Sequence, residues 1–253
     1  MLDSAQPKKP HRDDPRFLSS VERGFAVIEC LAGAVGPRSL TELSQATGLT
    51  IPTLQRLTSA LLEAGYVEKA GSSKRYRLTI RALDLLYYFL SRNGFAKIAW
   101  PHMVRLRELV QLDVALALPL GHTMIYLHRL PGHRGSYEST LPGKRSPLHA
   151  SASGLCILAA LSEAGLETYL DVAAPPEDHK TLRDAVSLCQ ERGYGLVQEA
   201  GPLGQITLAC PVVHSGSVIA GVSVQAPTTL TAANDLIAQT LPDIRKAAVN
   251  LSS

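Results

Sequence analysis

One short stretch of the sequence carries side chains that could read DNA. Gln55 has an amide that can pair with adenine, and Arg56 has a guanidinium that can bind guanine or a phosphate. Thr53 and Ser59 add hydroxyl groups that can bond phosphates or meet a thymine methyl group. Apolar residues recur between them at helical spacing, which predicts one helix with a packed face and a hydrogen-bonding face. The alternative for Arg56 is an ion pair with an acidic residue of its own domain.

Basic residues follow this helix at the tip of a predicted hairpin. Two short strands, 66–70 and 75–79, flank a turn that brings Lys74 and Arg75 to the tip. Residues 51–81 hold six Lys and Arg against two Asp and Glu, whereas the whole chain has a formal net charge of only +3. This local excess fits contacts with a phosphate backbone, although a merely solvated turn has the same composition.

A second group of polar residues lies in apolar surroundings and could bind a small carboxylate. Ser151 and Ser153 come just before a predicted helix, whose N-terminal N–H groups favour an anion. Thr207, Ser223 and Gln225 interrupt apolar strands, and alternation places the last two on one face. The alternative is that each hydroxyl bonds its own backbone.

The sequence offers little for metal or catalytic chemistry. The four cysteines lie far apart with no C-x-x-C pair, so we expect them to be reduced and buried. They are Cys30, Cys156, Cys189 and Cys210. His122, His128 and His133 have no acidic or thiol cluster beside them, and neither a G-x-S-x-G motif nor a glycine-rich phosphate loop is present. We therefore expect no metal site, no cofactor and no catalytic residue.

Export and membrane insertion are also not expected. The N-terminus has no apolar signal core, which predicts a cytoplasmic protein. Residues 200–234 carry no charged side chain, but Pro202, Pro211 and Pro227 interrupt each apolar run. The runs are too short to span a membrane and predict buried strands instead.

Start and stop signals outline a helix-turn-helix around the first group. A helix is predicted over 20–32, and a capping box from Ser39 to Glu42 opens a short second helix. Thr50 is expected to cap the third helix through its hydroxyl, with Pro52 in the first turn and a left-handed stop at Gly65. Two helices joined by a short turn and followed by a hairpin predict a winged helix-turn-helix.

The rest of the chain predicts an α+β domain. An apolar helix over 80–93 must pack on something, for which a second subunit is our interpretation. After a helix at 96–111, strands and helices alternate around an antiparallel centre, which predicts a sheet covered by helices. The expected strands are 113–118, 123–129, 194–199, 205–213 and 217–226. The expected helices are 154–162, 178–192 and 231–251.

Several short motifs occur in a fixed order along the chain. They are Ser20-Val-Glu-Arg-Gly-Phe-Ala-Val-Ile28, Leu40-Thr-Glu-Leu43, Arg56-Leu57 with Leu62-x-x-Gly-Tyr-Val67, Tyr76-x-Leu78, Pro147-Leu-His-Ala150 with Gly154, and Ala209-x-Pro-Val212. In these motifs and in its order of elements, the chain resembles the IclR family of bacterial transcriptional regulators. The resemblance implies an N-terminal DNA-binding domain, dimerisation partly through the N-terminal and linker helices, and a GAF-like C-terminal domain that binds a small organic effector.

The chain departs from the family pattern at three places. Leu155 stands where a lysine commonly follows the glycine of the fifth motif. Val197 or Ala200 stands where an acidic residue is common, and Ile51-Pro52 replaces a small polar pair. The first two departures concern the expected effector site, and the third leaves fewer polar groups at the start of the DNA-reading helix.

Two candidate sites follow from the residues and the resemblance together. The expected DNA-binding residues are Ser39, Thr50, Thr53, Gln55, Arg56, Ser59, Lys74 and Arg75. The expected effector-binding residues are His149, Ala150, Ser151, Ser153, Thr207, Ser223 and Gln225. For His149 the alternative is a core histidine whose hydrogen bonds are satisfied.

We expect four segments: a disordered arm over 1–16, a winged helix-turn-helix over 17–79, a linker helix over 80–94 and an effector-binding domain over 95–253. The predicted function is transcription regulation by a homodimer or homotetramer that binds double-stranded operator DNA. A small organic effector, a carboxylate or aromatic acid, would modulate that binding. A ligand sensor that acts through a protein partner is the alternative, and an enzyme comes third.

Overall fold

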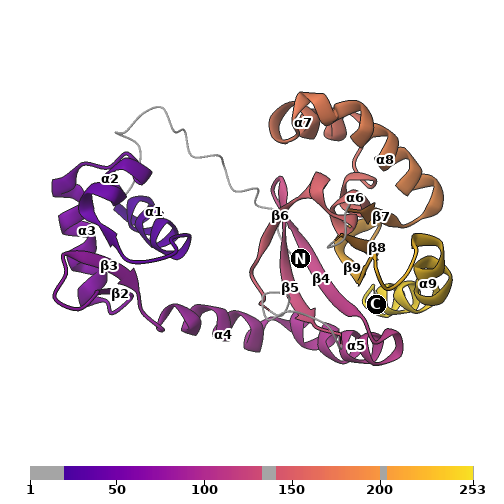
Figure 1. Ribbon diagram of the computed structural model, residues 1–253, viewed down its shortest axis with the longest axis horizontal. Coiled ribbons are helices and arrows are strands. Elements are labelled where there is room, and N and C mark those ends of the chain that lie inside the picture. The colour runs from indigo at the N-terminus through magenta and orange to yellow at the C-terminus, as the bar shows by residue number, and fades with distance from the viewer. Residues whose placement is uncertain (1–19, 133–140, 200–203, 253) are drawn as a thin grey trace. The chain divides into compact units, whose positions relative to one another are not determined.

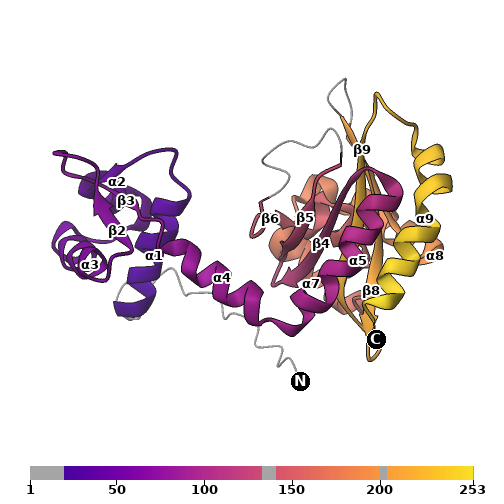
Figure 2. The same cartoon turned by 90° about the horizontal axis from the view of Figure 1, so that it is seen from below.

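The computed structural model describes residues 20–132, 141–199 and 204–252. They form two compact units, of which one ends at Arg92 and the other begins at Asn93 (Figure 1, Figure 2). The arm predicted over 1–16 lies outside the described residues.

The first unit contains three helices and a small antiparallel sheet. The helices are α1 (Ser20–Ala32), α2 (Leu40–Thr47) and α3 (Ile51–Glu63), and the strands, in sheet order, are β1 (Arg38–Ser39), β3 (Arg75–Leu78) and β2 (Val67–Lys69). Val27, Leu43 and Leu54 are fully buried at its centre. The predicted winged helix-turn-helix is present. Strand β1 was not predicted, because two residues are too few to show alternation.

Two of the predicted helix signals are present in this unit. Ser39 Oγ accepts the N–H of Glu42 at 3.3 Å, and Glu42 Oε2 accepts the N–H of Ser39 at 2.7 Å. These reciprocal bonds are the predicted capping box. Gly65 follows α3 with φ +75°, a left-handed conformation that glycine adopts without strain.

The prediction for Thr50 is wrong. Its hydroxyl makes no capping hydrogen bond and instead lies 2.9 Å from the hydroxyl of Thr53. Pro52 occupies the second helical position and has no N–H for a capping hydroxyl to bind, while Thr53 offers a competing hydroxyl. Thr50 still occupies the capping position immediately before α3, with an extended backbone.

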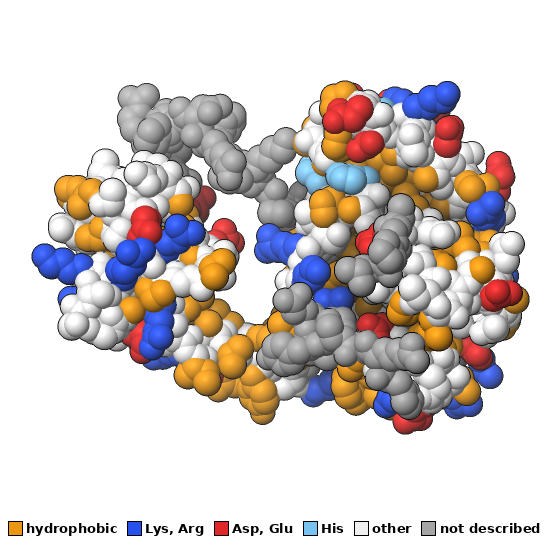
Figure 3. Space-filling model, viewed as in Figure 1, with side chains coloured by type: hydrophobic (Ala, Val, Ile, Leu, Met, Phe, Trp, Pro, Cys, Tyr) orange, Lys and Arg blue, Asp and Glu red, His pale blue; other side chains and the backbone are white. Residues whose placement is uncertain are grey.

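Helix α4 (Ala82–Arg92) ends this unit and has no buried residue. Its large exposed apolar side chains are Leu83, Leu85, Tyr87, Tyr88 and Phe89. Figure 3 shows apolar side chains gathered along this helix. An apolar surface of this kind is typical of a site that another molecule covers.

The second unit is built on a six-stranded antiparallel sheet in the order β6-β5-β4-β9-β8-β7. The strands are β4 (Asp113–Leu120), β5 (Thr123–Leu130), β6 (Arg145–Pro147), β7 (Gly195–Gln198), β8 (Gln205–His214) and β9 (Ser217–Pro227). All five predicted strands of this domain are present, and β6 is an addition to them.

Helices cover both faces of this sheet, which confirms the predicted α+β class. On one face, α5 (Gly94–Val110) and α9 (Ala233–Asn250) pack side by side (Figure 2). On the other, α6 (Ala152–Leu158) packs against β7, β8 and β9, and α8 (His179–Arg192) packs against α6 and β7. Helix α7 (Glu163–Ala173) was not predicted, because only Tyr169 and Leu170 of its residues are buried. Short 3-10 turns occur at Leu148–Ala150 and Pro176–Asp178.

Glycines let α6 lie unusually close to its neighbours. A Cβ at Gly154 would overlap the carbonyl group of Leu148, and a Cβ at Gly195 would overlap the carbonyl oxygen of Ala152. A Cβ at Gly221 would lie 2.7 Å from a side-chain carbon of α6. The position of α6 against the sheet therefore depends on the absence of these three side chains.

Candidate functional site

The outer face of α3 presents Gln55, Arg56 and Ser59 to solvent. No ion pair involves Arg56 in the part of the chain that the structure describes. The opposite face is anchored by Leu54, which is fully buried, and by Thr58, whose hydroxyl donates to the Leu54 carbonyl oxygen at 2.8 Å. The helix thus combines exposed hydrogen-bonding groups with a fixed backbone, which is what direct contact with base edges requires.

Ser39 and Arg75, two predicted DNA-binding residues, are already bonded within the unit. The Ser39 hydroxyl donates to Glu42 Oε2 at 2.7 Å. Arg75 Nη2 lies 2.6 Å from Glu42 Oε1, and Arg75 Nε donates to the carbonyl oxygen of Pro37 at 3.0 Å. The hydrogen bonds from Ser39, with a smaller contribution from Arg75, lower the pKa of Glu42. A phosphate would have to compete with this carboxylate for Arg75.

The positive charge of this unit is smaller than the count over 51–81 indicates. Glu42 lies outside that range and pairs with Arg75, and Arg77 Nε pairs with Glu68 Oε1 at 2.6 Å. Lys74 is exposed and has no ion pair with any residue that the structure describes. Figure 3 shows Lys and Arg side chains on this unit with Asp and Glu side chains among them.

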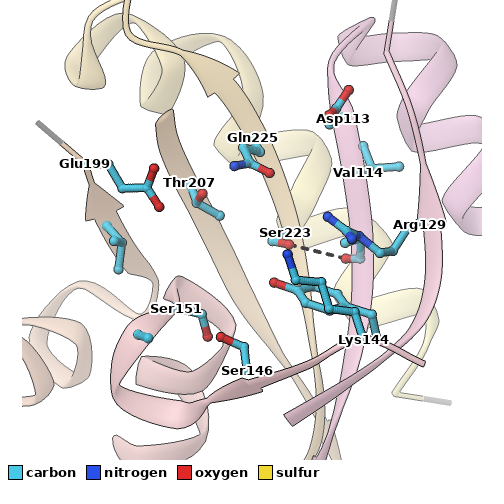
Figure 4. A pocket seen from close by; sticks show the side chains of 14 residues that line it. Asp113, Val114, Arg129, Lys144, Ser146, Ser151, Glu199, Thr207, Ser223 and Gln225 are labelled. Atoms are coloured by element: carbon cyan, nitrogen blue, oxygen red, sulfur yellow. Dashed lines mark hydrogen bonds between the residues drawn. The ribbon is translucent and has the colours of Figure 1, made fainter. Parts of the chain in front are cut away.

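The second unit contains a cavity of about 170 Å³ on the face of the sheet that carries α6 (Figure 4). Its lining residues are Asp113, Val114, Ala115, Tyr126, Arg129, Lys144, Ser146, Ala150, Ser151, Val197, Glu199, Thr207, Ser223 and Gln225. Five of the seven predicted effector-binding residues belong to this set. They are Ala150, Ser151, Thr207, Ser223 and Gln225.

Two adjacent cross-strand rows form the floor of the cavity. One row is Val197, Thr207, Gln225 and Asp113; the next is Gly195, Ala209, Ser223, Ala115 and Arg129. Within each strand the members of the two rows are two residues apart, so alternation turns both rows to the same face. Gly195 and Ala209 lie under α6, and Ala115 has a side chain too small to fill the space above it. Small side chains thus make the hollow, and polar neighbours supply its hydrogen-bonding groups.

A bulge in β5 brings Tyr126 and Arg129 into the cavity together. Leu127 has no partner on β4, because the residues on either side of it pair with consecutive residues of that strand. In a regular strand, two residues three apart would face opposite sides of the sheet, and the bulge removes this difference. The guanidinium carbon of Arg129 lies 4.6 Å from the centre of the Tyr126 ring, and burial raises the pKa of this tyrosine.

Four charged residues of the cavity were not predicted. They are Asp113, Arg129, Lys144 and Glu199. Figure 4 shows Glu199 and Thr207 on one side of the cavity and Arg129 and Lys144 on the other. Asp113 Oδ1 accepts the N–H of Gly132 at 2.7 Å. Alternation could have found Asp113 and Glu199, because each lies at one end of a predicted strand, two residues from another residue of the cavity face. Arg129 depends on a bulge and Lys144 on a turn.

The cavity contains one of the two positions considered for the acidic residue that is common in the family. Val197, an apolar residue of β7, lines the cavity at this position. Glu199 lies two residues further along and supplies a carboxylate at the same edge. Ala200 lies outside the described residues. The cavity therefore contains an acidic group even though Val197 does not provide it.

The hydroxyl groups of Ser151 and Ser223 differ in the strength of the hydrogen bonds that they make within the chain. Ser151 Oγ accepts the N–H of Gly154 at 3.0 Å and donates to the sulfur of Met124 at 3.0 Å, so it caps α6. Ser223 Oγ donates to the carbonyl oxygen of Ala115 at 3.5 Å, which is long for a hydrogen bond between oxygens. Ser223 can therefore exchange its partner for a ligand at little cost.

His149 and Ser153 do not line the cavity. His149 Nδ1 lies 2.8 Å from the hydroxyl oxygen of Tyr169, which also accepts the backbone N–H of His149 at 3.1 Å. His149 is half-buried, and its Nδ1 already has a partner within the chain. Ser153 is 1% exposed, and its hydroxyl has no hydrogen-bond partner among the described residues. It packs against Gly221 instead of facing the cavity.

Neither a metal cluster nor a membrane helix occurs in the described ranges. No group of three or more His, Cys, Asp and Glu is placed there to hold a metal ion. His133, one of the three histidines considered in the sequence analysis, lies outside the described residues. None of the described helices is both long enough and apolar enough to cross a membrane.

Comparison with known proteins identifies the family of both parts of the chain. Residues 88–253 match a family model described as "Bacterial transcriptional regulator IclR C-terminal", and residues 20–71 match one described as "IclR helix-turn-helix domain". The HTH-type transcriptional regulator XynR of Escherichia coli (strain K12) is 25% identical over 221 residues, which cover 84% of this chain and 88% of XynR.

Solved structures resemble this fold over almost its whole length. An IclR family transcriptional regulator from Brucella abortus has a TM-score of 0.79 and 26% identity, covering 95% of this chain and 93% of its own. An IclR homolog from Microbacterium hydrocarbonoxydans, complexed with 4-hydroxybenzoate, has a TM-score of 0.73 and 24% identity, covering 92% of this chain and 98% of its own.

Proposed function

This chain belongs to the IclR family of bacterial transcriptional regulators, and we propose that its control of transcription depends on a small organic carboxylate bound in the cavity of the second unit. It is a DNA-binding regulator, as its relatives are. The observation that carries the proposal is the cavity itself. It combines hydroxyl, amide and cationic groups on the face of a sheet whose remaining surface is covered by helices.

The chemistry of the cavity favours an acid that also carries a hydroxyl group. Arg129 and Lys144 supply positive charge for a carboxylate, and charge-assisted hydrogen bonds are the strong ones in such sites. Thr207 and Ser223 can donate or accept, and Glu199 can accept a hydrogen bond from a ligand hydroxyl. A volume of about 170 Å³ fits a small acid, because sites for drug-sized ligands run from roughly 300 to 1,000 Å³.

For DNA, we propose that Gln55, Arg56 and Ser59 contact base edges or phosphates and that Lys74 contacts the backbone beside them. Thr53 is half-buried and bonded to Thr50, so we assign both to the start of the helix and place the reading function on the exposed three. These groups are presented on one face of α3, which is the geometry that major-groove recognition uses.

We propose further that the regulator is a homodimer or a dimer of dimers, and that effector binding changes how its two winged helices are held. The apolar surface of α4 is the support for this part, because such a surface is expected to be covered. Two half-sites must be contacted together, so a small shift between subunits alters operator affinity. Action on chromosomal DNA places the protein in the cytoplasm. Binding, without catalysis, accounts for both sites.

The proposal is tested by titrating the protein with a panel of small acids, each matched with its uncharged amide. The panel includes hydroxy acids and 4-hydroxybenzoate. Thermal unfolding reports binding, and a gel-shift assay with DNA from beside the gene reports the change in operator affinity. We expect at least one acid, and not its amide, to raise the unfolding temperature and to change operator affinity.

Two variants and one matched control locate the bound acid. Lys144→Met should weaken binding of the acid by about 1.5–3 kcal/mol, on the order of ten- to a hundredfold. Ser223→Ala should weaken it by about 1 kcal/mol. Lys180→Met removes an exposed charge from α8 and should change nothing. Binding of amides as tightly as acids, or an equal loss in Lys180→Met, would place the ligand elsewhere or give it a different chemistry.

A further inference from the structure

The cavity of the second unit holds charges of both signs, and the two signs lie on different sides of it. Arg129 and Lys144 are on one side and Glu199 is on the other (Figure 4). Among the described residues, neither Lys144 nor Glu199 belongs to an ion pair. A ligand carboxylate accounts for the cationic side. A ligand hydroxyl, however, uses only the hydrogen-bonding capacity of Glu199 and not its charge.

The cationic side is built around Tyr126. The N–H of Tyr126 donates to the carbonyl oxygen of Lys144 at 3.0 Å, which fixes the backbone of Lys144 beside β5. The guanidinium carbon of Arg129 lies 4.6 Å from the centre of the Tyr126 ring. The fold thus holds two cations on the same side of one cavity, where they repel each other. A bound anion relieves this repulsion, which makes this side the place for the carboxylate.

The acidic side is fixed by the pairing of β7 with β8. The N–H of Glu199 donates to the carbonyl oxygen of Gln205 at 2.9 Å, so the pairing continues one residue beyond the end of β7. Glu199 lies two residues from Val197, and alternation turns both side chains toward the cavity. Its side chain is also exposed, which places it at the open edge. The other acid, Asp113, already accepts the N–H of Gly132 at 2.7 Å.

We propose that the effector is a small amino acid whose carboxylate binds Arg129 and Lys144 and whose ammonium group, at the other end of the molecule, binds Glu199. This inference rests on the proposed function, since it names the class of acid that the same cavity takes. An ammonium group donates three hydrogen bonds where a hydroxyl donates one, and its bond to a carboxylate is charge-assisted. Thr207 lies on the Glu199 side and offers a second acceptor (Figure 4).

The width of the sheet favours a ligand with its two charges far apart. Strands β8, β9 and β4 lie between β7 and β5 in the sheet. At about 4.8 Å per strand, the backbones that carry Glu199 and Arg129 are about 19 Å apart along the sheet. Both long side chains reach inward, and a gap of several ångströms remains between their charges. A linear ω-amino acid spans such a gap better than an α-amino acid, in which both groups flank one carbon atom.

The test is isothermal titration calorimetry of the full-length protein with matched sets of acids. The amino acids are 3-aminopropanoate, 4-aminobutanoate and 5-aminopentanoate, each compared with the hydroxy acid of the same length and with its own N-acetyl derivative. We expect at least one amino acid to bind about three- to tenfold more tightly than its hydroxy acid, a modest factor because Glu199 is exposed. Acetylation removes the positive charge and keeps the carboxylate, so the N-acetyl derivative should lose this preference.

Three variants assign the two ends of the ligand. Glu199→Gln keeps a hydrogen-bonding group without the charge, so the amino acid and the hydroxy acid should bind equally, and affinity for the hydroxy acid should stay close to that of the wild type. Lys144→Met should weaken both acids and leave their ratio unchanged. Glu191→Gln is the matched control, because it removes an exposed carboxylate from α8, and it should change neither affinity.

The outcomes separate this inference from the proposed function. Equal binding of amino and hydroxy acids by the wild type, or binding of 4-hydroxybenzoate without any amino acid, would overturn the inference and leave the proposed function in place. A preference that survives in Glu199→Gln, or that disappears in Asp113→Asn instead, would overturn it as well. If neither 4-hydroxybenzoate nor any of these acids binds, the proposed function itself fails.

Discussion

The side chains that we propose to read DNA belong to one helix of 13 residues, whereas the cavity of the second unit is lined by residues from six strands and the loops between them. On α3 the backbone of a single helix sets the spacing of Gln55, Arg56 and Ser59. In the cavity, position depends on strand register, on one bulge and on the closeness of α6 to the sheet. A change in sequence should therefore act locally in the first region and through the fold in the second.

The two regions also differ in how their charges are arranged. In the first unit, Glu42 and Glu68 pair with Arg75 and Arg77, so a phosphate would have to compete with a carboxylate for each of these two arginines. In the cavity, charged residues of both signs are gathered around a space large enough for a ligand. Stability and binding should thus be separable in the first region and closely linked in the second.

The largest effect is expected where α6 meets its neighbours. In Gly154→Ala the new Cβ would overlap the Leu148 carbonyl group, and the free energy of unfolding should fall by about 3 kcal/mol or more. Gly24→Ala in α1 is the control, because a Cβ there meets nothing within 4 Å, and it should be neutral or stabilising by up to about 1 kcal/mol. Denaturant unfolding measures both. An equal loss of unfolding free energy in the two variants would contradict the expected difference between the two regions.

The next effect concerns the exposed face of α3. Arg56→Ala and Gln55→Ala should each weaken operator binding by about 1–3 kcal/mol, or roughly ten- to a hundredfold, without lowering thermal stability. A gel-shift assay against operator and scrambled DNA measures the loss. Lys180→Ala removes the same charge as Arg56→Ala from an exposed site on the other unit and should have little effect. Normal operator affinity in both α3 variants would contradict the assignment.

A smaller effect should distinguish two neighbours in the wing. Lys74→Ala should weaken binding to all DNA sequences alike and reduce the salt dependence by about one released counterion. Arg75→Ala should mainly affect stability, by no more than about 1 kcal/mol, because its ion pair with Glu42 is partly exposed. The salt series and thermal unfolding are measured on the same preparations. If Arg75→Ala has the larger effect on salt dependence, phosphates compete successfully with Glu42.

The smallest effect is a pH dependence of the first unit. The pKa of Glu42 lies below its ordinary value of 4.5, so its contribution to stability is present above that pH and is lost as pH falls through the lowered value. Glu42→Gln keeps a hydrogen-bonding group but has no charge to lose. Its unfolding temperature should therefore fall less than that of the wild type on acidification. If the unfolding temperatures of the variant and the wild type fall equally with pH, Glu42 contributes nothing to the pH dependence of stability.

The sequence predicted the helix-turn-helix well because each signal is local. The capping box spans Ser39 to Glu42, and the polar face of α3 repeats within a few residues. The same reasoning did not find the pair between Glu42 and Arg75, which are 33 residues apart in the chain. It also predicted a cap at Thr50, although Pro52 removes one of the two N–H groups that such a cap can use and the Thr53 hydroxyl bonds Thr50 instead.

For the cavity, the sequence identified five of the fourteen lining residues. Strand alternation placed Ser223 and Gln225 on one face, and the register confirms this placement, with Thr207 and Asp113 in the same row as Gln225. Lys144 lies just before β6, where alternation gives no direction, and Arg129 lies beyond a bulge that alternation does not predict. Only pairing between strands far apart in sequence brings the lining residues to one place.

The bulge at Leu127 has a consequence for how such a protein can diverge. Loss of the Leu127 codon would leave Tyr126 and Arg129 two residues apart in a regular strand, so both side chains would still face the cavity. The bulge therefore lets β5 be one residue longer without changing which of its side chains line the cavity. Descendants of one ancestor could differ in the length of β5 at this point and still keep the same charge in the cavity.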